Sequence, residues 1–344
     1  MREKLMIRRR TFFIFFALAL AVLLTTFRVP LASSQAVTLQ AVQVSGELPE
    51  DDPDSPLWQS AAAAAIPLSA QTVSRPILRQ AQVKSVVARA LHNGGRIAFL
   101  VEWEDETHND QALRVQDFRD AVALQFPQAA GPPFFCMGMQ GGNVNIWHWK
   151  ADWQAEMLAW QDMEAIYPNM SVDLYPFAQV ELPAPADYLD SNYLPALAAG
   201  NLLAAPHVSS VEDLLAGGFG TLTAQTAEGQ NVQGYGEWAE GKWRVIFSRD
   251  LASAEADDVD FAPGQVYSVA FAAWDGANGE RNGQKSTSQW VSLELKGQAA
   301  GQADGQAGQE QPAGRLPNTF LLVYLGVLAL LVIVGTIIYF RLPE

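Results

Sequence analysis

The sequence predicts a mainly β protein: an antiparallel β-sandwich with a few short helices, followed by a transmembrane helix near the C-terminus. Segments with the alternating pattern of strands recur between residues 37 and 296, and turn residues separate most of them. A long apolar run without a charge follows them before the end of the 344-residue chain. Short strands with regular turn signals are typical of sandwiches and barrels.

Residues 1–36 have the order of segments that an export signal shows. A basic stretch that includes Arg8, Arg9 and Arg10 is followed by the apolar run 12–24 and then by small residues at 32–36. This order of basic, apolar and small segments directs a chain across the cytoplasmic membrane. We therefore expect residues 1–36 to be a signal peptide or an uncleaved signal anchor.

The strand pattern is clearest at residues 96–103, where Ile97, Phe99, Val101 and Trp103 fall on one face. The other segments predicted as strands are 121–126, 242–248, 266–274 and 288–295. Helical patterns are sparse, and we expect one helix over 153–166 and a short second one over 210–216. Residues 168–206 are rich in Pro, Ala and Tyr and are expected to form a long excursion over the sandwich.

The C-terminal part predicts a tether to the membrane. Residues 297–318 are rich in Gly, Gln and Ala and are expected to form a flexible linker. The 22 uncharged residues 319–340 would span about 33 Å as a helix, which is enough to cross a bilayer core. Arg341 marks residues 341–344 as the cytoplasmic tail, so we expect domain 37–296 on the extracytoplasmic, periplasmic side.

Composition excludes several classes of function. The chain has 22 Lys and Arg against 37 Asp and Glu, a net charge of −15, which argues against nucleic acid as a partner. A single cysteine permits no internal disulfide, four-thiolate zinc site or CxxCH haem attachment. We find no GxSxG, HExxH, Walker or GxGxxG motif, so the sequence predicts no enzyme. Asp275–Glu280 and Asp257–Asp260 carry oxygen ligands for a cation, but a hairpin turn and a solvated acidic loop are the favoured interpretations.

Two segments hold more aromatic, methionine and lysine residues than a scaffold needs. The first runs from Pro132 to Trp153 and crowds Met137 and Met139 with three tryptophans around a Gly-rich turn. The second runs from Ala273 to Trp290 and places Lys285 at the start of the final strand.

These segments resemble the haem-binding gamma subunits of the ethylbenzene dehydrogenase group, which includes the dimethylsulfide dehydrogenases and the selenate and chlorate reductases. The resemblance rests on motifs that occur in the same order over most of 40–296. They are the Phe-x-Met-Gly turn at 135–138, Asn-Ile-Trp-x-Trp-Lys-Ala-Asp at 145–152, Gly-Phe-Gly-Thr at 218–221, residues 241–249 and the Trp-Asp-Gly to Trp run at 274–290.

The resemblance implies a sandwich that holds one haem b non-covalently, with a methionine and a lysine as axial ligands of the iron. The motifs point to Met137, with Met139 as the alternative, and to Lys285, with Lys242 and Lys150 as weaker candidates. The further residues that it suggests near the haem are Arg281 and Arg249 as partners of the propionates, Trp147, and His148 as a reserve ligand.

Such a haem has no open coordination position and therefore moves electrons. The resemblance implies an exported, membrane-anchored b-type cytochrome that exchanges single electrons with a molybdoenzyme or a respiratory carrier. Its partners would be the catalytic and iron–sulfur subunits of a molybdoenzyme or a soluble cytochrome. The alternative is an extracytoplasmic sandwich that binds a carbohydrate or another ligand without haem, because ten tryptophans would also serve stacking.

Overall fold

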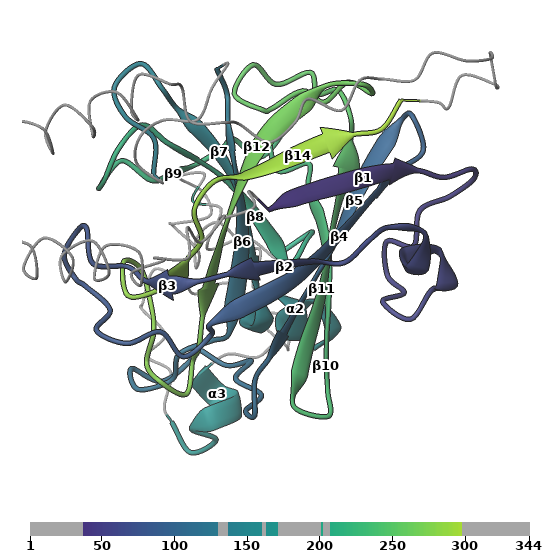
Figure 1. The fold of residues 1–344 in the computed structure, drawn as a ribbon. Helices are drawn as coiled ribbons and strands as arrows, with labels where there is room; N and C mark the ends of the chain where they lie inside the picture. Colours follow the sequence, from purple (N-terminus) through teal and green to yellow (C-terminus); the bar gives the residue numbers. More distant parts are fainter. Residues whose placement is uncertain (1–36, 130–136, 160–162, 171–200, 202–206, 298–344) are drawn as a thin grey trace, which may run out of the picture. The chain divides into compact units, whose positions relative to one another are not determined.

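The computed structural model describes residues 37–129, 137–159, 163–170, 201 and 207–297, and these form an almost entirely β structure (Figure 1). The mainly β class predicted from the sequence is confirmed. In chain order the elements are β1 (Thr38–Gln43), the 3-10 helix η1 (Pro56–Ser60), β2 (Ala64–Pro67), β3 (Ser69–Ala70), β4 (Ser85–His92), β5 (Arg96–Glu104), β6 (Ala121–Pro127), β7 (Val144–Lys150), α2 (Ala151–Leu158), α3 (Met163–Ile166), β8 (Val211–Ala216), β9 (Thr223–Ala224), β10 (Gln233–Ala239), β11 (Lys242–Asp250), β12 (Val266–Trp274), β13 (Ser286–Thr287) and β14 (Val291–Leu295).

Strand β12 joins two halves of one continuous sheet, whose strand order is β10-β11-β5-β4-β1-β14-β12-β6-β7-β8-β9. Val266–Val269 of β12 pair with β14, whereas Ala270–Trp274 pair with β6. The halves can therefore face each other as the layers of a sandwich. Most neighbours are antiparallel, as expected, but β1 runs parallel to both β14 and β4, between which it lies in Figure 1.

Large aromatic side chains from both halves meet in the core. The ring of Phe99 on β5 lies 5.9 Å from that of Trp147 on β7, and Trp103 lies 6.3 Å from Trp149. Successive side chains of a strand point to opposite faces. Because Trp147 and Trp149 face the core, His148 between them faces the opposite side of the second half, and this alternation positions the cavity described below.

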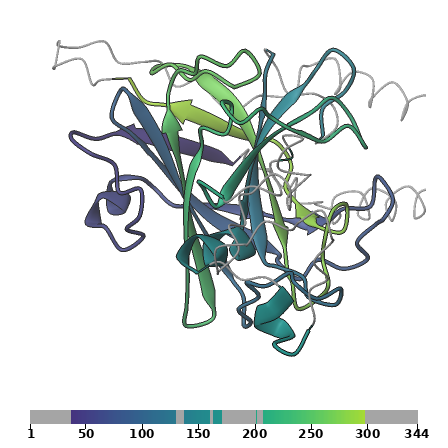
Figure 2. The same ribbon diagram turned by 180° about the vertical axis from the view of Figure 1, so that it is seen from behind.

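The β10–β11 hairpin turns at Glu240 and Gly241, both of which have positive φ. Two residues with positive φ match the twist of the strands that a tight hairpin connects. In the two opposite views of the ribbon, α2 lies beside this hairpin (Figures 1 and 2), and the Gln154 side chain accepts a hydrogen bond from the Gly236 N–H at 3.0 Å.

The structure corrects the short helix expected at 210–216, which is the extended strand β8 between β7 and β9. Seven residues are too few to distinguish the period of a helix from that of a strand. The segment is a strand because it pairs with β7 on one edge and with β9 on the other. The helix expected at 153–166 begins earlier, as α2, and resumes as α3. The strand expected at 288–295 begins at Val291.

Several predicted segments lie outside the described residues: the signal at 1–36, most of the excursion, and the linker and membrane helix beyond residue 297. Within the part of the chain that the structure describes, no helix is long and apolar enough to cross a bilayer.

Candidate functional site

A cavity of about 860 Å³ lies over the outer face of the second half of the sheet. Its floor includes Ala121 and Ala123 on β6 and Ala270 and Ala272 on β12, and Ala123 pairs in register with Ala272 on one side and His148 on the other. Alanine side chains project by a single methyl group, so this floor leaves room above the sheet for a bulky ligand. Binding pockets for small molecules and cofactors have volumes in this range.

The walls of the cavity are mainly apolar. Phe118, Trp274, Phe219 and Leu222 line it. Phe219 and Leu222 are 44% and 50% exposed although they are large apolar side chains. Exposed apolar groups around a concave site are typical of a surface that an apolar ligand covers.

Met137 and Lys285 meet in this cavity from segments that lie far apart in the sequence. The Nζ atom of Lys285 is 3.5 Å from the Sδ atom of Met137. It also lies 5.0 Å from the centre of the Trp274 ring. The structure thus brings together the two residues that the resemblance proposed as axial ligands.

The backbone fixes both residues in place. The Met137 carbonyl accepts a hydrogen bond from the Gly218 N–H at 2.8 Å, and the Lys285 carbonyl accepts one from the Gln71 N–H at 2.9 Å. Gly138 has φ +74° and packs so closely that a Cβ there would lie 2.6 Å from the Ala216 carbonyl oxygen. Only glycine fits this turn, which explains the glycine that follows the methionine.

The spacing of the two side chains suits a shared metal ion. A thioether sulfur is an established ligand of haem iron. The amine nitrogen of Lys285 lies 3.5 Å from the Met137 sulfur, so both donors reach one place in the cavity. The apolar walls and alanine floor provide the surface that a porphyrin requires, so the residues fit haem.

The alternative ligands occupy other environments. Met139 is 45% exposed, pairs with Gly142 through its backbone and does not line the cavity. Lys150 is buried against Glu212, and its Nζ lies 3.8 Å from the centre of the Trp153 ring.

The remaining lysine candidate is at the surface. The Nζ of Lys242 lies 3.2 Å from the Glu104 carboxylate, on the first half of the sheet. Neither Lys150 nor Lys242 lines the cavity.

The two arginines that we expected near the haem propionates lie in different parts of the structure. Arg281 lines the cavity, and its guanidinium lies 4.6 Å from the centre of the Phe118 ring. Arg249 is only 2% exposed, and its Nη1 lies 3.3 Å from the Asp258 carboxylate. Its guanidinium is 5.0 Å from the ring centre of Trp147, which is fully buried on the core side of β7. The structure therefore brings Arg281 to the cavity but neither Arg249 nor Trp147.

His148 lies in the cavity floor and stacks on Trp274 at 4.6 Å between ring centres. Burial lowers its pKa well below the usual histidine value, and the nearby cations Lys150, Arg119 and Lys285 lower it further. Its imidazole is therefore neutral at neutral pH. The Nε2 atom is buried and has no hydrogen-bond partner within the described structure.

Sequence reasoning missed part of this site. Arg75 lines the cavity together with Arg281, and the alanine floor and Leu222 were not predicted as site residues. The Gly-Phe-Gly-Thr motif at 218–221 was the available signal for Phe219. Nothing in the local sequence distinguishes Arg75 from a surface arginine.

Comparisons with known proteins find relatives that are named as heme or gamma subunits. A protein of Haloferax mediterranei described as a respiratory nitrate reductase heme subunit (ORF7) is 26% identical over 254 residues, covering 72% of this chain and 71% of that protein. The chlorate reductase subunit gamma of Ideonella dechloratans is 25% identical over 71% of this chain and 79% of its own length. The dimethylsulfide dehydrogenase subunit gamma of Rhodovulum sulfidophilum is 25% identical over 63% of each chain.

Among solved structures, a family 9 carbohydrate-binding module from Caldicellulosiruptor kristjanssonii in complex with glucose aligns with 78% of this chain and 100% of its own, at 7% identity and a TM-score of 0.35. That score is too low to say anything about ligands. A family model described as ethylbenzene dehydrogenase matches residues 55–286, which include both Met137 and Lys285. The chain therefore belongs to the ethylbenzene dehydrogenase family.

Proposed function

We propose that this chain is an exported, membrane-anchored b-type cytochrome that carries single electrons to or from a molybdoenzyme or a respiratory carrier. The observation that carries the proposal is the approach of Lys285 Nζ to Met137 Sδ, at 3.5 Å, inside an apolar cavity of about 860 Å³. The relatives named as heme or gamma subunits of nitrate reductase, chlorate reductase and dimethylsulfide dehydrogenase support it. Like them, the chain is an accessory subunit of an oxidoreductase and not its catalytic subunit.

Each residue of the site has a definite task in this proposal. When bound, haem supplies a one-electron iron couple. Met137 provides a neutral thioether, which favours the ferrous state and raises the potential. Lys285 would hold the iron through its neutral amine, which requires the loss of a proton that free lysine keeps up to a pH of about 10.4. A bound cation beside the amine would favour that loss. Arg281 and Arg75 can pair with the propionate carboxylates.

The ligand assignment can be tested with the full-length chain purified in detergent. We expect a b-type spectrum in the pyridine haemochrome assay and about one haem per chain. Met137→Ala should shift the Soret band and lower the potential because a neutral sulfur ligand is lost. Met139→Ala is the matched control and should leave both unchanged. A colourless protein, or equal effects of the two substitutions, would overturn the proposal.

The electron-transfer role needs a partner. We propose the catalytic and iron–sulfur subunits of a molybdoenzyme, or a soluble cytochrome, since the relatives are named as subunits of such reductases and dehydrogenases. Co-purification of these subunits with the tagged chain, followed by stopped-flow oxidation of the reduced haem, tests this role. Loss of haem oxidation in Lys285→Ala, with the complex intact, is the expected result. A complex that turns over equally well without the haem would contradict it.

The proposed location rests on the sequence signals at residues 1–36 and 319–340. A chain that ends at Gly297 should be released from the membrane fraction of spheroplasts, whereas the full chain should remain bound. Protease added to intact spheroplasts should digest the β domain of the full chain, because we place that domain outside the cytoplasmic membrane. Protection of the domain would refute this location.

A further inference from the structure

Arginines without a carboxylate partner gather at the mouth of the cavity. Among the residues that the structure describes, every arginine except Arg75, Arg79 and Arg281 lies within 4.0 Å of a carboxylate. Arg75 and Arg281 line the cavity, and Arg79 follows Arg75 on the same exposed loop. The chain has 37 acidic and 22 basic residues, yet no Asp or Glu occurs from residue 55 to residue 101. An acidic protein thus presents a positive mouth.

The carboxylates that line the cavity do not balance these arginines. Asp117 binds Arg114, whose Nε lies 2.8 Å from the Asp117 carboxylate. Glu280 is only 2% exposed, and its carboxylate accepts hydrogen bonds from the Asp275 N–H at 3.1 Å and the Asn278 side chain at 3.0 Å. Both carboxylates are therefore engaged within the fold.

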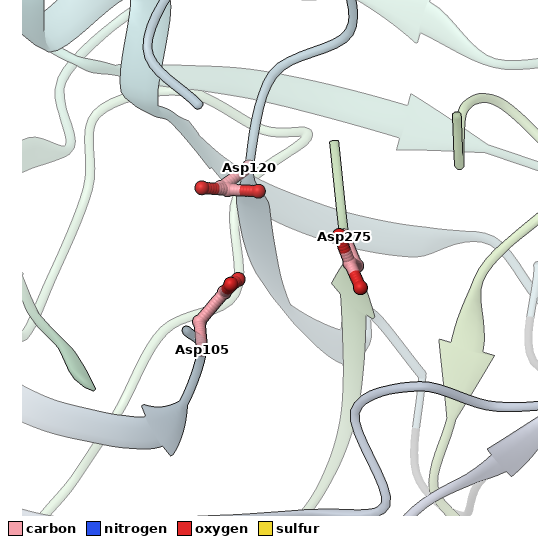
Figure 3. A group of neighbouring side chains, drawn as sticks. All are labelled: Asp105, Asp120 and Asp275. Atoms are coloured by element: carbon pink, nitrogen blue, oxygen red, sulfur yellow. The ribbon is translucent and has the colours of Figure 1, made fainter. Parts of the chain in front are cut away.

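Three further aspartates lie beside residues of the cavity wall but face one another. Figure 3 shows Asp105, Asp120 and Asp275 pointing toward one another, and one oxygen of each lies within 4.8 Å of the others. The Asp120 carboxylate accepts hydrogen bonds from the N–H groups of Asn109, Gly276 and Trp243. None of the three has an arginine or lysine within 4.0 Å in the described part of the chain. The positive charge of the mouth therefore remains.

Residues 72–79, which we call the mouth loop, also expose apolar side chains. Val73 is 66% exposed and Ile77 is 41% exposed, and Thr72 to Pro76 line the cavity. Arginine is enriched in the interfaces of protein complexes, and apolar side chains form the buried centre of such interfaces. The mouth loop combines both features at the entrance of the proposed haem site.

The mouth loop is held in a fixed conformation. Gln71 is buried, and its Nε2 donates to the carbonyl groups of Gly283 at 2.7 Å and Ser74 at 2.9 Å. Its Oε1 accepts from the Ser74 N–H at 2.8 Å. A Cβ at Gly283 would lie 2.9 Å from the Pro76 carbonyl oxygen, so the loop packs directly on the turn that carries Arg281. A surface that is ordered before binding loses less conformational entropy when a partner docks.

We propose that the mouth loop and Arg281 form the docking surface for the acidic face of an iron–sulfur protein that exchanges one electron with the haem. This inference rests on the proposed function, because it requires a haem in the cavity. A reduced iron–sulfur cluster loses one electron, ferric haem gains it, and no bond forms or breaks. The two propionates would balance Arg75 and Arg281. Arg79 then remains to attract the partner, since complementary charges speed the encounter of two proteins.

The first test mixes the haem-loaded full-length chain in detergent with reduced plant-type ferredoxin, a small acidic iron–sulfur protein. The rate constant of haem reduction should fall as salt is added, because salt screens exposed charges. Arg79→Glu should lower this rate constant about tenfold at low ionic strength. Lys296→Glu is the matched control, because it makes the same change of charge at an exposed residue that does not line the cavity. It should have a much smaller effect.

Trypsin gives a second readout, which does not require haem. Arg79 and Gln80 are exposed, so trypsin should cut the chain after Arg79, whereas Pro76 protects the bond after Arg75. An excess of oxidised ferredoxin should slow this cut in the full-length chain in phosphatidylcholine nanodiscs. Addition of phosphatidylglycerol to the nanodiscs should not slow it. Ile77→Ser should weaken the protection by ferredoxin.

The outcomes separate this inference from the proposed function. Equal rates of haem reduction in Arg79→Glu and Lys296→Glu, with unchanged haem content, would refute the docking surface and leave the cytochrome in place. Protection by phosphatidylglycerol but not by ferredoxin would assign the mouth loop to the membrane surface and overturn the inference. A colourless chain would contradict the proposed function, and without protection by ferredoxin the docking surface would be refuted as well.

Discussion

Ala123→Leu should weaken haem binding without unfolding the protein. Ala123 is 3% exposed, lies in the middle of β6 and forms the cavity floor with Ala272 and His148 in register beside it. Leucine adds three carbon atoms, which would project into the empty volume of about 860 Å³ and not into the core. Overpacking of a filled site costs about 1–3 kcal/mol. At about 1.4 kcal/mol per factor of ten, haem affinity should fall roughly 5- to 150-fold.

The assay is transfer of haem from the purified chain to an excess of a haem-scavenging globin, followed by the Soret band. Ala65→Leu is the matched control, because it makes the same change at an exposed position of β2. Faster haem loss in Ala123→Leu alone, with an unchanged far-UV circular dichroism spectrum, is the expected result. If Ala123→Leu retained haem as the wild type does, the haem would lie elsewhere and the floor would have another purpose.

Three further predictions concern stability. Glu212→Gln should lower the free energy of unfolding in urea by about 3–5 kcal/mol, because Lys150 is 3% exposed and would lose the carboxylate that balances its buried charge. Gly236→Ala should lower the Tm, because the added Cβ would lie 2.1 Å from the ring of Trp149 and force the strand or the ring to move. Burial first, and then Asp258, raises the pKa of Asp213 from 3.8 to about 8. The folded state thus keeps a proton that the unfolded chain releases, so stability should fall as pH rises from about 4 to about 8, and Asp213→Asn should flatten this dependence in a series of Tm measurements.

Each of these three has a result that would count against it. An unchanged urea midpoint for Glu212→Gln would mean that Lys150 is already neutral in the folded protein. A wild-type Tm for Gly236→Ala would mean that β10 packs more loosely against β7 than the structure shows. Equal pH slopes for the wild type and Asp213→Asn would place the titrating group elsewhere.

Strand prediction depended on large apolar residues and on turn residues at the ends, and not on a single buried face. In β5, Ile97, Phe99, Val101 and Trp103 pack in the aromatic core, while Ala98 and Leu100 on the other face are buried in a second cluster. Strand β7, with six buried residues out of seven, and strand β4, which ends in three consecutive buried residues, also lack a clear period of two, and neither was predicted. Strand β8 was mistaken for a helix because Asp213 is buried in the core, where a polar residue is not expected.

The sequence predicted only part of the candidate site, because motifs do not show which face of a strand a residue occupies. Met137 and Lys285 stand in recognisable motifs, and the structure brings their side chains together. Trp147 and Arg249 stand in motifs as well, but their strands turn them into the core, where they contact each other. Which face a side chain occupies depends on strand pairing, and a motif of neighbouring residues does not contain that information.

The most direct measurement of the central claim is iron X-ray absorption on the haem-loaded full-length chain. Axial ligation by Met137 and Lys285 predicts one sulfur in the first shell of the iron in the wild type, none in Met137→Leu, and two in Lys285→Met. Met139→Leu should keep the single sulfur. A first shell without sulfur in the wild type, or one that keeps its sulfur in Met137→Leu, would contradict the account.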